Sequence, residues 1–185
     1  MSSSDLVRWG GLAAMAAGAV WIATGLLGRV VVNPETNSWV NVLFIVAVLL
    51  VLVGLVGFHT LQKGNYGRIG RAGFYTVIVA TFAQVLALVV FLAGSDALFW
   101  LQFPVGGLAV LVGFVLYGAA TLQARVLPRW CGIAFIIAVP VSVALGGAFG
   151  SPGIDYVWLG LVWLALGYAL WWRREASAQQ PSRVR

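Results

Sequence analysis

The sequence predicts an all-α fold: a polytopic bundle of six transmembrane helices. Three observations support this prediction, namely the composition, a series of long apolar stretches separated by short polar segments, and a one-sided distribution of Lys and Arg. Of the 185 residues, 62% are hydrophobic and 9% are charged, and the mean hydropathy is +0.99. Soluble domains have about 45–50% apolar and about 25% charged residues. The composition therefore excludes an ordinary soluble domain and a disordered chain.

Six apolar stretches have the length that a membrane-spanning helix needs, which is about 20 residues. They are residues 7–27, 39–61, 72–93, 100–122, 131–149 and 156–172. Because these stretches are continuously apolar rather than alternating, they favour helices over a β-barrel. We assign residues 1–175 to a single transmembrane domain. Residues 176–185, rich in Ser, Gln and Pro, are predicted to form a disordered, basic cytoplasmic tail.

The first three spans are each recognisable by their composition and by the segments that separate them. The first is unusually rich in Gly and Ala and includes the pair Ala14 and Gly18, which predicts close packing against a neighbouring helix or a partner chain. The second begins at Trp39 after a polar segment that contains Pro34. The third follows a connection, residues 62–71, that is rich in Gly, Lys and Arg.

The last three spans carry equally clear markers. The fourth begins at Trp100, and the fifth begins at Cys131 and contains Pro140, which is expected to kink the helix. The sixth ends at Trp171 and Trp172, directly before two arginines, a combination typical of a membrane interface. All connections are short, so consecutive helices are expected to run antiparallel and adjacent.

The basic residues predict the orientation of the bundle. With six spans, both termini and the second and fourth connections lie on one side of the membrane, and this side carries ten of the eleven lysines and arginines. The positive-inside rule then places both termini in the cytoplasm. Because the basic residues are spread over loop ends beside the membrane, the net charge of +6 indicates topology and contact with anionic headgroups rather than nucleic-acid binding.

The chain resembles itself at an offset of 61 residues. At this offset Trp39 falls on Trp100, residues 60–62 (Thr-Leu-Gln) fall on residues 121–123, and Arg68 falls on Arg129. No gap is needed across the helix–loop–helix. We interpret the pattern as a bundle of repeated helical hairpins, an organisation that is common in transporters. A chance match of similar membrane compositions is the alternative.

One part of the chain resembles a known group of proteins. Residues 113–118 (Gly-Phe-Val-Leu-Tyr-Gly), followed by residues 126–132 (Val-Leu-Pro-Arg-Trp-Cys-Gly), are similar to a pattern in uncharacterised bacterial six-span integral membrane proteins with a Leu-Pro-Arg-Trp cytoplasmic loop. The resemblance extends from the fourth predicted span into the fifth. It implies a multi-pass protein of the bacterial inner membrane, and it transfers no catalytic residue.

Residues that could carry out chemistry are few. No Asp, Glu, Lys or Arg lies deep in a predicted span, which argues against proton-coupled transport. The single histidine, His59, cannot provide paired haem ligands or, alone, a zinc site, although an acid–base pair with Tyr66 or Thr60 is conceivable. The single cysteine, Cys131, excludes an intramolecular disulfide and is expected to be a buried small residue rather than a palmitoylation site.

Neutral polar side chains at depth are the remaining candidates for a ligand site. Gln84 lies near the middle of the third span, and Asn41 and Gln102 occupy equivalent repeat positions near the outer surface. An amide in hydrocarbon needs a hydrogen-bond partner, which is either another helix or a ligand. We therefore name Gln84, Asn41, Gln102 and His59 as possible polar residues of a ligand cavity.

The absence of buried charge and the small-residue first helix favour a non-enzymatic structural or accessory protein. Such a protein would pack with membrane lipids, with a partner membrane protein or with a second copy of itself, and no cofactor or metal is expected. The alternative is a small transporter or binding protein for a neutral or hydrophobic solute, suggested by the repeat, Pro140 and the three amides. An intramembrane enzyme that uses His59 is a third hypothesis.

Overall fold

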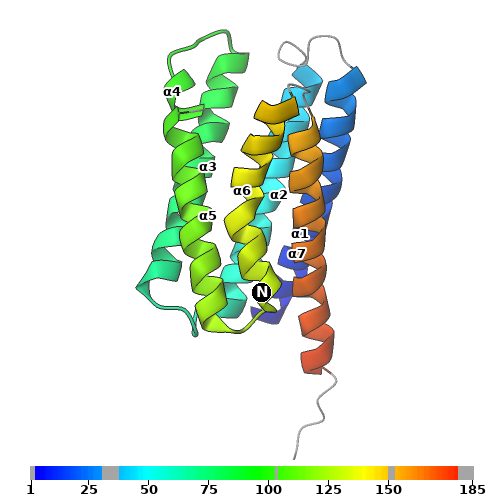
Figure 1. Cartoon of the computed structure of the whole chain (residues 1–185), viewed down its shortest axis with the longest axis vertical. Helices are drawn as coiled ribbons and strands as arrows, with labels where there is room; N and C mark the ends of the chain where they lie inside the picture. The colour runs from blue at the N-terminus through cyan, green and yellow to red at the C-terminus, as the bar shows by residue number, and fades with distance from the viewer. Residues whose placement is uncertain (1–2, 31–37, 103, 150–152, 179–185) are drawn as a thin grey trace, which may run out of the picture.

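The fold is all-helical, as the sequence predicts. The computed structural model describes residues 3–30, 38–102, 104–149 and 153–178, and these residues form helices joined by turns. The helices are α1 (Ser3–Val30), α2 (Ser38–Gln62), α3 (Arg68–Leu92), α4 (Phe99–Gln102), α5 (Pro104–Ala124), α6 (Arg129–Phe149) and α7 (Ile154–Ala178). Within these ranges, all helices except α4 are long and apolar enough to cross a membrane (Figure 1). The structure therefore supports a six-span, multi-pass membrane protein.

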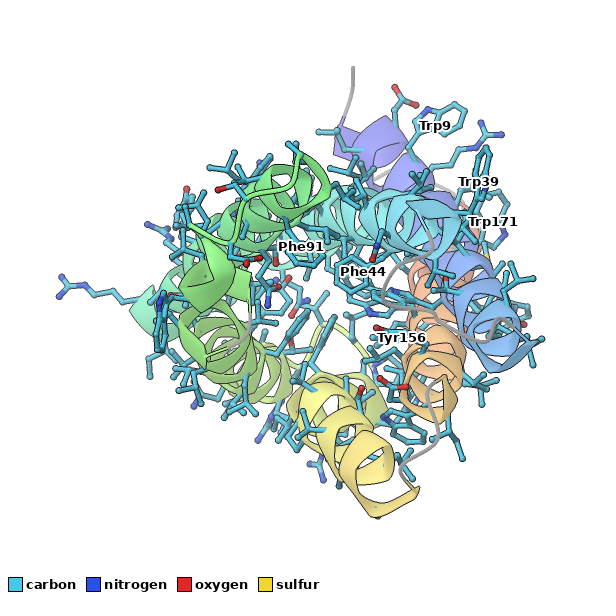
Figure 2. The ribbon with its side chains drawn as sticks, turned by 90° about the horizontal axis from the view of Figure 1, so that it is seen from above. Trp9, Trp39, Phe44, Phe91, Tyr156 and Trp171 are labelled. Carbon is cyan, nitrogen blue, oxygen red and sulfur yellow. The ribbon has the colours of Figure 1, made fainter. Side chains whose placement is uncertain are left out.

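The six long helices form a ring in which neighbours in sequence are also neighbours in space. Helix α1 packs against α2 and α7, α3 packs against α5, and α6 packs between α5 and α7. A smaller contact between α2 and α3 completes the ring, as the view along the bundle shows (Figure 2). The described residues nearest the two termini lie at the same end of the bundle (Figure 1).

The helices have limits that differ by a few residues from the expected spans, and two of the differences concern the fourth span and the tail. The expected fourth span, residues 100–122, is not one helix: α4 ends at Gln102 and a separate helix, α5, begins at Pro104. Proline has no backbone N–H to donate and suits the first turn of a helix, so a new helix begins there. Helix α7 continues to Ala178, which is three residues into the expected tail. Residues 179–185 of the expected tail lie outside the described residues.

Helices α1 and α7 touch through their backbones along a seam of six glycines. Gly11, Gly18 and Gly25 are spaced by seven residues and lie on one face of α1. Gly160 and Gly167 have the same spacing on α7, and Gly153 directly precedes that helix. The pairs across the seam are Gly11 with Gly167, Gly18 with Gly160, and Gly25 with Gly153. A Cβ atom at Gly18 would lie 2.6 Å from the carbonyl oxygen of Gly160. Only glycine allows this approach, so the close packing expected of the first span is found.

The other seams of the ring divide into two kinds. Glycine also brings backbones together between α1 and α2 (Gly10 and Gly57), between α3 and α5 (Gly73 and Gly113) and between α5 and α6 (Gly118 and Gly132). Between α2 and α3, large side chains make the contact instead, as described below. The ring is therefore tightest around α1 and looser between α2 and α3.

Exposed tryptophans lie near both ends of the bundle. Trp9, Trp130 and Trp172 lie toward the end that holds the termini, and Trp39 and Trp100 lie toward the opposite end. Figure 2 shows Trp9 and Trp39 at the periphery of the ring. Tryptophan is enriched at membrane–water interfaces. Between the two tryptophan levels, large apolar side chains such as Val79, Leu108 and Val143 are exposed, as expected for a lipid-facing surface.

We predict that Gly18→Ala destabilises the protein by about 1–3 kcal/mol, because the added methyl group must push α1 away from α7. The measurement is the thermal unfolding midpoint in a mild detergent. Gly147→Ala, at an exposed position of α6, is the control, since a Cβ atom there meets no heavy atom of the described residues within 4 Å. Its midpoint should be unchanged or slightly higher, because alanine is the better helix former. Equal midpoints for the two variants would contradict the role of the seam.

Candidate functional site

A cluster of buried aromatic rings fills part of the interior of the ring. Phe135 of α6 lies at its centre, with Phe58 and Tyr117 at centroid distances of 5.2 Å. Trp163 of α7 lies 6.0 Å from Phe135, and Phe114 of α5 lies 6.1 Å from it. All five side chains are buried. The cluster therefore joins α2, α5, α6 and α7 through side chains.

His59 lies at one edge of this cluster, in the last turn of α2. Its imidazole ring stacks on Phe74 of α3, with the centroids 4.0 Å apart and the planes at 21°. The Tyr66 hydroxyl, in the turn between α2 and α3, hydrogen-bonds to Nδ1 of His59. Tyr66 and Phe74 also approach Tyr117 of α5, at centroid distances of 6.0 and 6.3 Å. These contacts hold the looser α2–α3 side of the ring together.

The protonation of Tyr66 determines the direction of its hydrogen bond. Burial raises the pKa of Tyr66 to about 12, although the nearby charge of Arg71 acts in the opposite direction. The phenol therefore keeps its proton throughout the physiological range and donates it to Nδ1. A neutral His59 then carries its own hydrogen on Nε2.

The acid–base pair suggested by the sequence is thus His59 with Tyr66, and Thr60 takes no part in it. The Thr60 hydroxyl donates instead to the carbonyl oxygen of Val56, one turn earlier in α2. A phenol with a raised pKa is a poor proton donor in catalysis at neutral pH. The arrangement therefore fits a clamp between the α2–α3 turn and α3 better than it fits a catalytic pair.

Gln62 and Tyr117 are buried polar residues near this clamp. Both side chains are fully buried, and neither the Gln62 amide nor the Tyr117 hydroxyl has a hydrogen-bond partner among the described residues. Gln62 lies one turn before Tyr66, and its carbonyl oxygen accepts from the Tyr66 N–H. A buried polar group without a partner costs about 1–3 kcal/mol. Within the described residues, the Gln62 amide and the Tyr117 hydroxyl therefore each carry a desolvation cost that no hydrogen bond offsets.

A second aromatic cluster lies toward the other end of the bundle. Trp21 of α1 has Phe44 of α2 at 5.1 Å and Tyr156 of α7 at 5.2 Å, and Figure 2 shows Phe44 and Tyr156 reaching inward. Nearby on α7, the indole N–H of Trp158 donates to the carbonyl oxygen of Ala138. Ala138 lies two residues before Pro140, so this bond ties α7 to α6 close to the proline.

The structure does not bring the four predicted polar residues into one cavity. Asn41, in the first turn of α2, and His59, in its last turn, are separated by about 27 Å at 1.5 Å per residue. Gln84 of α3 is half-buried and packs against Gly106 of α5. Gln102 belongs to α4, and its side chain lies outside the described residues. Asn41, Gln84 and Gln102 all lie toward the end opposite His59.

Gln62 and Tyr117 are not among the site residues predicted from the sequence. The repeated tripeptide Thr-Leu-Gln, at residues 60–62 and 121–123, includes Gln62. It gives no reason to choose Gln62 over Gln123, because both glutamines occupy the same position in the repeat. In the structure Gln62 is fully buried, whereas Gln123 is exposed. The two amides occupy equivalent positions in the repeat, and only the packing of the helices makes one buried and the other exposed.

A groove opens on the outer surface between α3 and α5. It has a volume of about 490 Å³ and is lined mainly by apolar side chains. The lining residues are Tyr75, Thr76, Val79, Ala80, Ala83, Leu101, Val105, Gly106 and Ala109. Gly106 is essential to its shape, since a Cβ atom there would collide with the carbonyl oxygen of Leu101 in α4.

Cys131 and the metal-ligating residue types add no further site to those described above. Cys131 is fully buried, which agrees with the expected buried small residue and argues against lipid modification. In the part of the chain that the structure describes, no three His, Cys, Asp or Glu side chains come together as metal ligands. Comparison with protein-family models, with curated proteins and with solved structures found no match to this chain.

We predict that Gln62→Leu raises the thermal unfolding midpoint in detergent, corresponding to a gain of about 1–3 kcal/mol. The reason is that leucine removes two unpaired polar atoms from a buried position at little change in volume. Gln123→Leu, at the exposed repeat-equivalent position, should leave the midpoint unchanged. A lower midpoint for Gln62→Leu would instead mean that the amide has a bound polar partner in the membrane.

Proposed function

We propose that this protein is a non-enzymatic accessory protein of the bacterial inner membrane that works by binding membrane lipid or a partner membrane protein. The observation that carries the proposal is the position of the groove. It faces the surrounding membrane between α3 and α5, whereas buried aromatic side chains pack in the interior. A hydrophobic molecule in the bilayer can reach this groove without disturbing the bundle.

We further propose that both termini lie in the cytoplasm. The charges at the two ends of the bundle support this orientation. The end that holds the termini carries Lys63, Arg68, Arg71, Arg125 and Arg129, and the opposite end carries Asp96 and Asp155. Basic residues are retained on the cytoplasmic side of bacterial membrane proteins.

Cysteine labelling tests this orientation. In a Cys131→Ala background, Ser95→Cys and Asn65→Cys place single thiols at exposed positions of opposite ends. We expect a membrane-impermeant maleimide to label Ser95→Cys in intact cells, and to label Asn65→Cys only after the membrane is permeabilised. The reverse pattern would invert the orientation, and labelling of both in intact cells would contradict the six-span topology.

Native mass spectrometry tests the proposed function. We expect the protein, extracted in a mild detergent, to retain phospholipid or a second protein at a defined stoichiometry. His59→Ala should retain the same ligands, because His59 does not line the groove. A bare monomer, free of both lipid and partner, would contradict the proposal.

A second candidate function is the binding or transport of a small neutral solute. The observation that favours it is the pair of buried polar groups, Gln62 and Tyr117, that lack partners among the described residues. A solute with both a donor and an acceptor would satisfy them. A solute that stays bound to Gln62 in the purified protein would make Gln62→Leu lower the thermal unfolding midpoint, which is opposite to the change predicted above.

A further inference from the structure

The groove between α3 and α5 has walls from both helices and a closed end at α4. Tyr75, Val79 and Ala83 are spaced by four residues and therefore lie along one face of α3. Val105 and Ala109 form the facing wall on α5. The groove begins next to the place where Gly73 and Gly113 bring the two backbones together.

The walls of the groove are open to the membrane. The exposed fractions are 59% for Tyr75, 67% for Val79 and 56% for Val105. The lining nearest the helix contact is made of small residues, including Ala80 and Gly106. Large exposed side chains on both sides and small residues at the bottom give the groove a shape suited to a slender apolar chain. A lipid acyl chain has this shape and is present at high concentration in a bilayer.

The charges at the two ends of the groove differ in sign. Arg68 lies seven residues before Tyr75 on α3, so it lies on the same face about 10 Å along the helix axis. Arg71 lies one turn before Tyr75, and both arginines are exposed. Toward the opposite end, the turn between α3 and α4 carries the exposed Asp96. An anionic group is therefore attracted to the arginine end and repelled from the other.

We propose that the groove is a binding site for one anionic phospholipid, whose acyl chain lies between α3 and α5 and whose phosphate lies at Arg68 and Arg71. This inference rests on the proposed lipid-binding function and specifies its ligand. Guanidinium groups suit phosphate because they offer several N–H donors in a fixed plane. The headgroup belongs to the leaflet on the side of the termini, and the chain extends from there along Tyr75 and Val79 toward α4.

Competition in nanodiscs tests this proposal. The full-length protein is reconstituted in equal parts of phosphatidylglycerol and phosphatidylcholine with identical acyl chains, and the lipids retained on gentle release are counted by native mass spectrometry. We expect one retained phosphatidylglycerol. Each arginine near the headgroup should favour the anionic lipid about fivefold. Arg68→Gln with Arg71→Gln should therefore reduce the preference by about 25-fold.

Control variants distinguish lipid binding at the groove from a general attraction of anionic lipid to the basic end of the bundle. Arg129→Gln, at the repeat-equivalent exposed position on α6, should leave the preference unchanged. Ala83→Phe and Ala109→Phe fill the groove from opposite walls, and each should abolish retention of the lipid. Ala165→Phe, at an exposed position on α7, should retain it. The thermal midpoints of the three alanine variants show whether a loss reflects the groove or unfolding.

Several outcomes would overturn the proposal. Equal retention of the two lipids by the native protein, or equal effects of Arg129→Gln and Arg68→Gln, would contradict the headgroup site. Lipid retained by both folded groove-filling variants would contradict the acyl-chain site while leaving the general lipid-binding function intact. Loss of a bound protein rather than a lipid on Ala83→Phe would show that a partner helix occupies the groove. Absence of any lipid or partner on the native protein would contradict both proposals.

Discussion

The arrangement of this bundle depends on backbone contact between α1 and its two neighbours. In a bilayer the lipid is as apolar as the side chains, so helices associate where they can approach most closely. Helix α1 has glycine on two faces: Gly10 meets Gly57 of α2, and Gly18 meets Gly160 of α7. The first helix is thereby joined to the last, which closes the ring. The enclosed interior that the aromatic side chains fill exists only because of this closure.

The seams of the ring differ at positions that the proposed repeat makes equivalent. Between α5 and α6 the backbones meet at Gly118 and Gly132. At the offset of 61 residues, their counterparts are Gly57, which contacts α1 instead, and Arg71, which is exposed. Helices α2 and α3 therefore cannot join in the same way, and the stacked pair of His59 and Phe74 makes the contact. The duplication itself stays a prediction. The α2–α3 contact, where the two proposed copies differ, lies beside the buried polar residues Gln62 and Tyr117.

Most of the fold could be predicted from the sequence, because the length and apolarity of a membrane span are local properties. The same local reasoning placed His59 at the end of α2 and identified the first span as a packing helix. It missed the break before α5, because Pro104 lies within an otherwise continuous apolar stretch. The two buried polar residues beside the clamp, Gln62 and Tyr117, could not be predicted in this way. The burial of Gln62 and the exposure of Gln123 depend on which helices meet, and a pattern of residue types does not contain that information.

The energetics of the interior favour a ligand that arrives from the bilayer. Phe135 contacts four buried aromatic rings, from Phe58, Phe114, Tyr117 and Trp163. Each aromatic pair contributes about 0.5–1.5 kcal/mol beyond the area that it buries, so opening a path past Phe135 would cost several kcal/mol before any solute was bound. An acyl chain that enters the groove between α3 and α5 displaces only other lipid and leaves this cluster intact. Gln62 and Tyr117, whose polar side-chain atoms lack partners among the described residues, argue the other way, and they lie beside the clamp that holds the looser side of the ring. The same side chains that close the bundle there would have to move for a solute to enter.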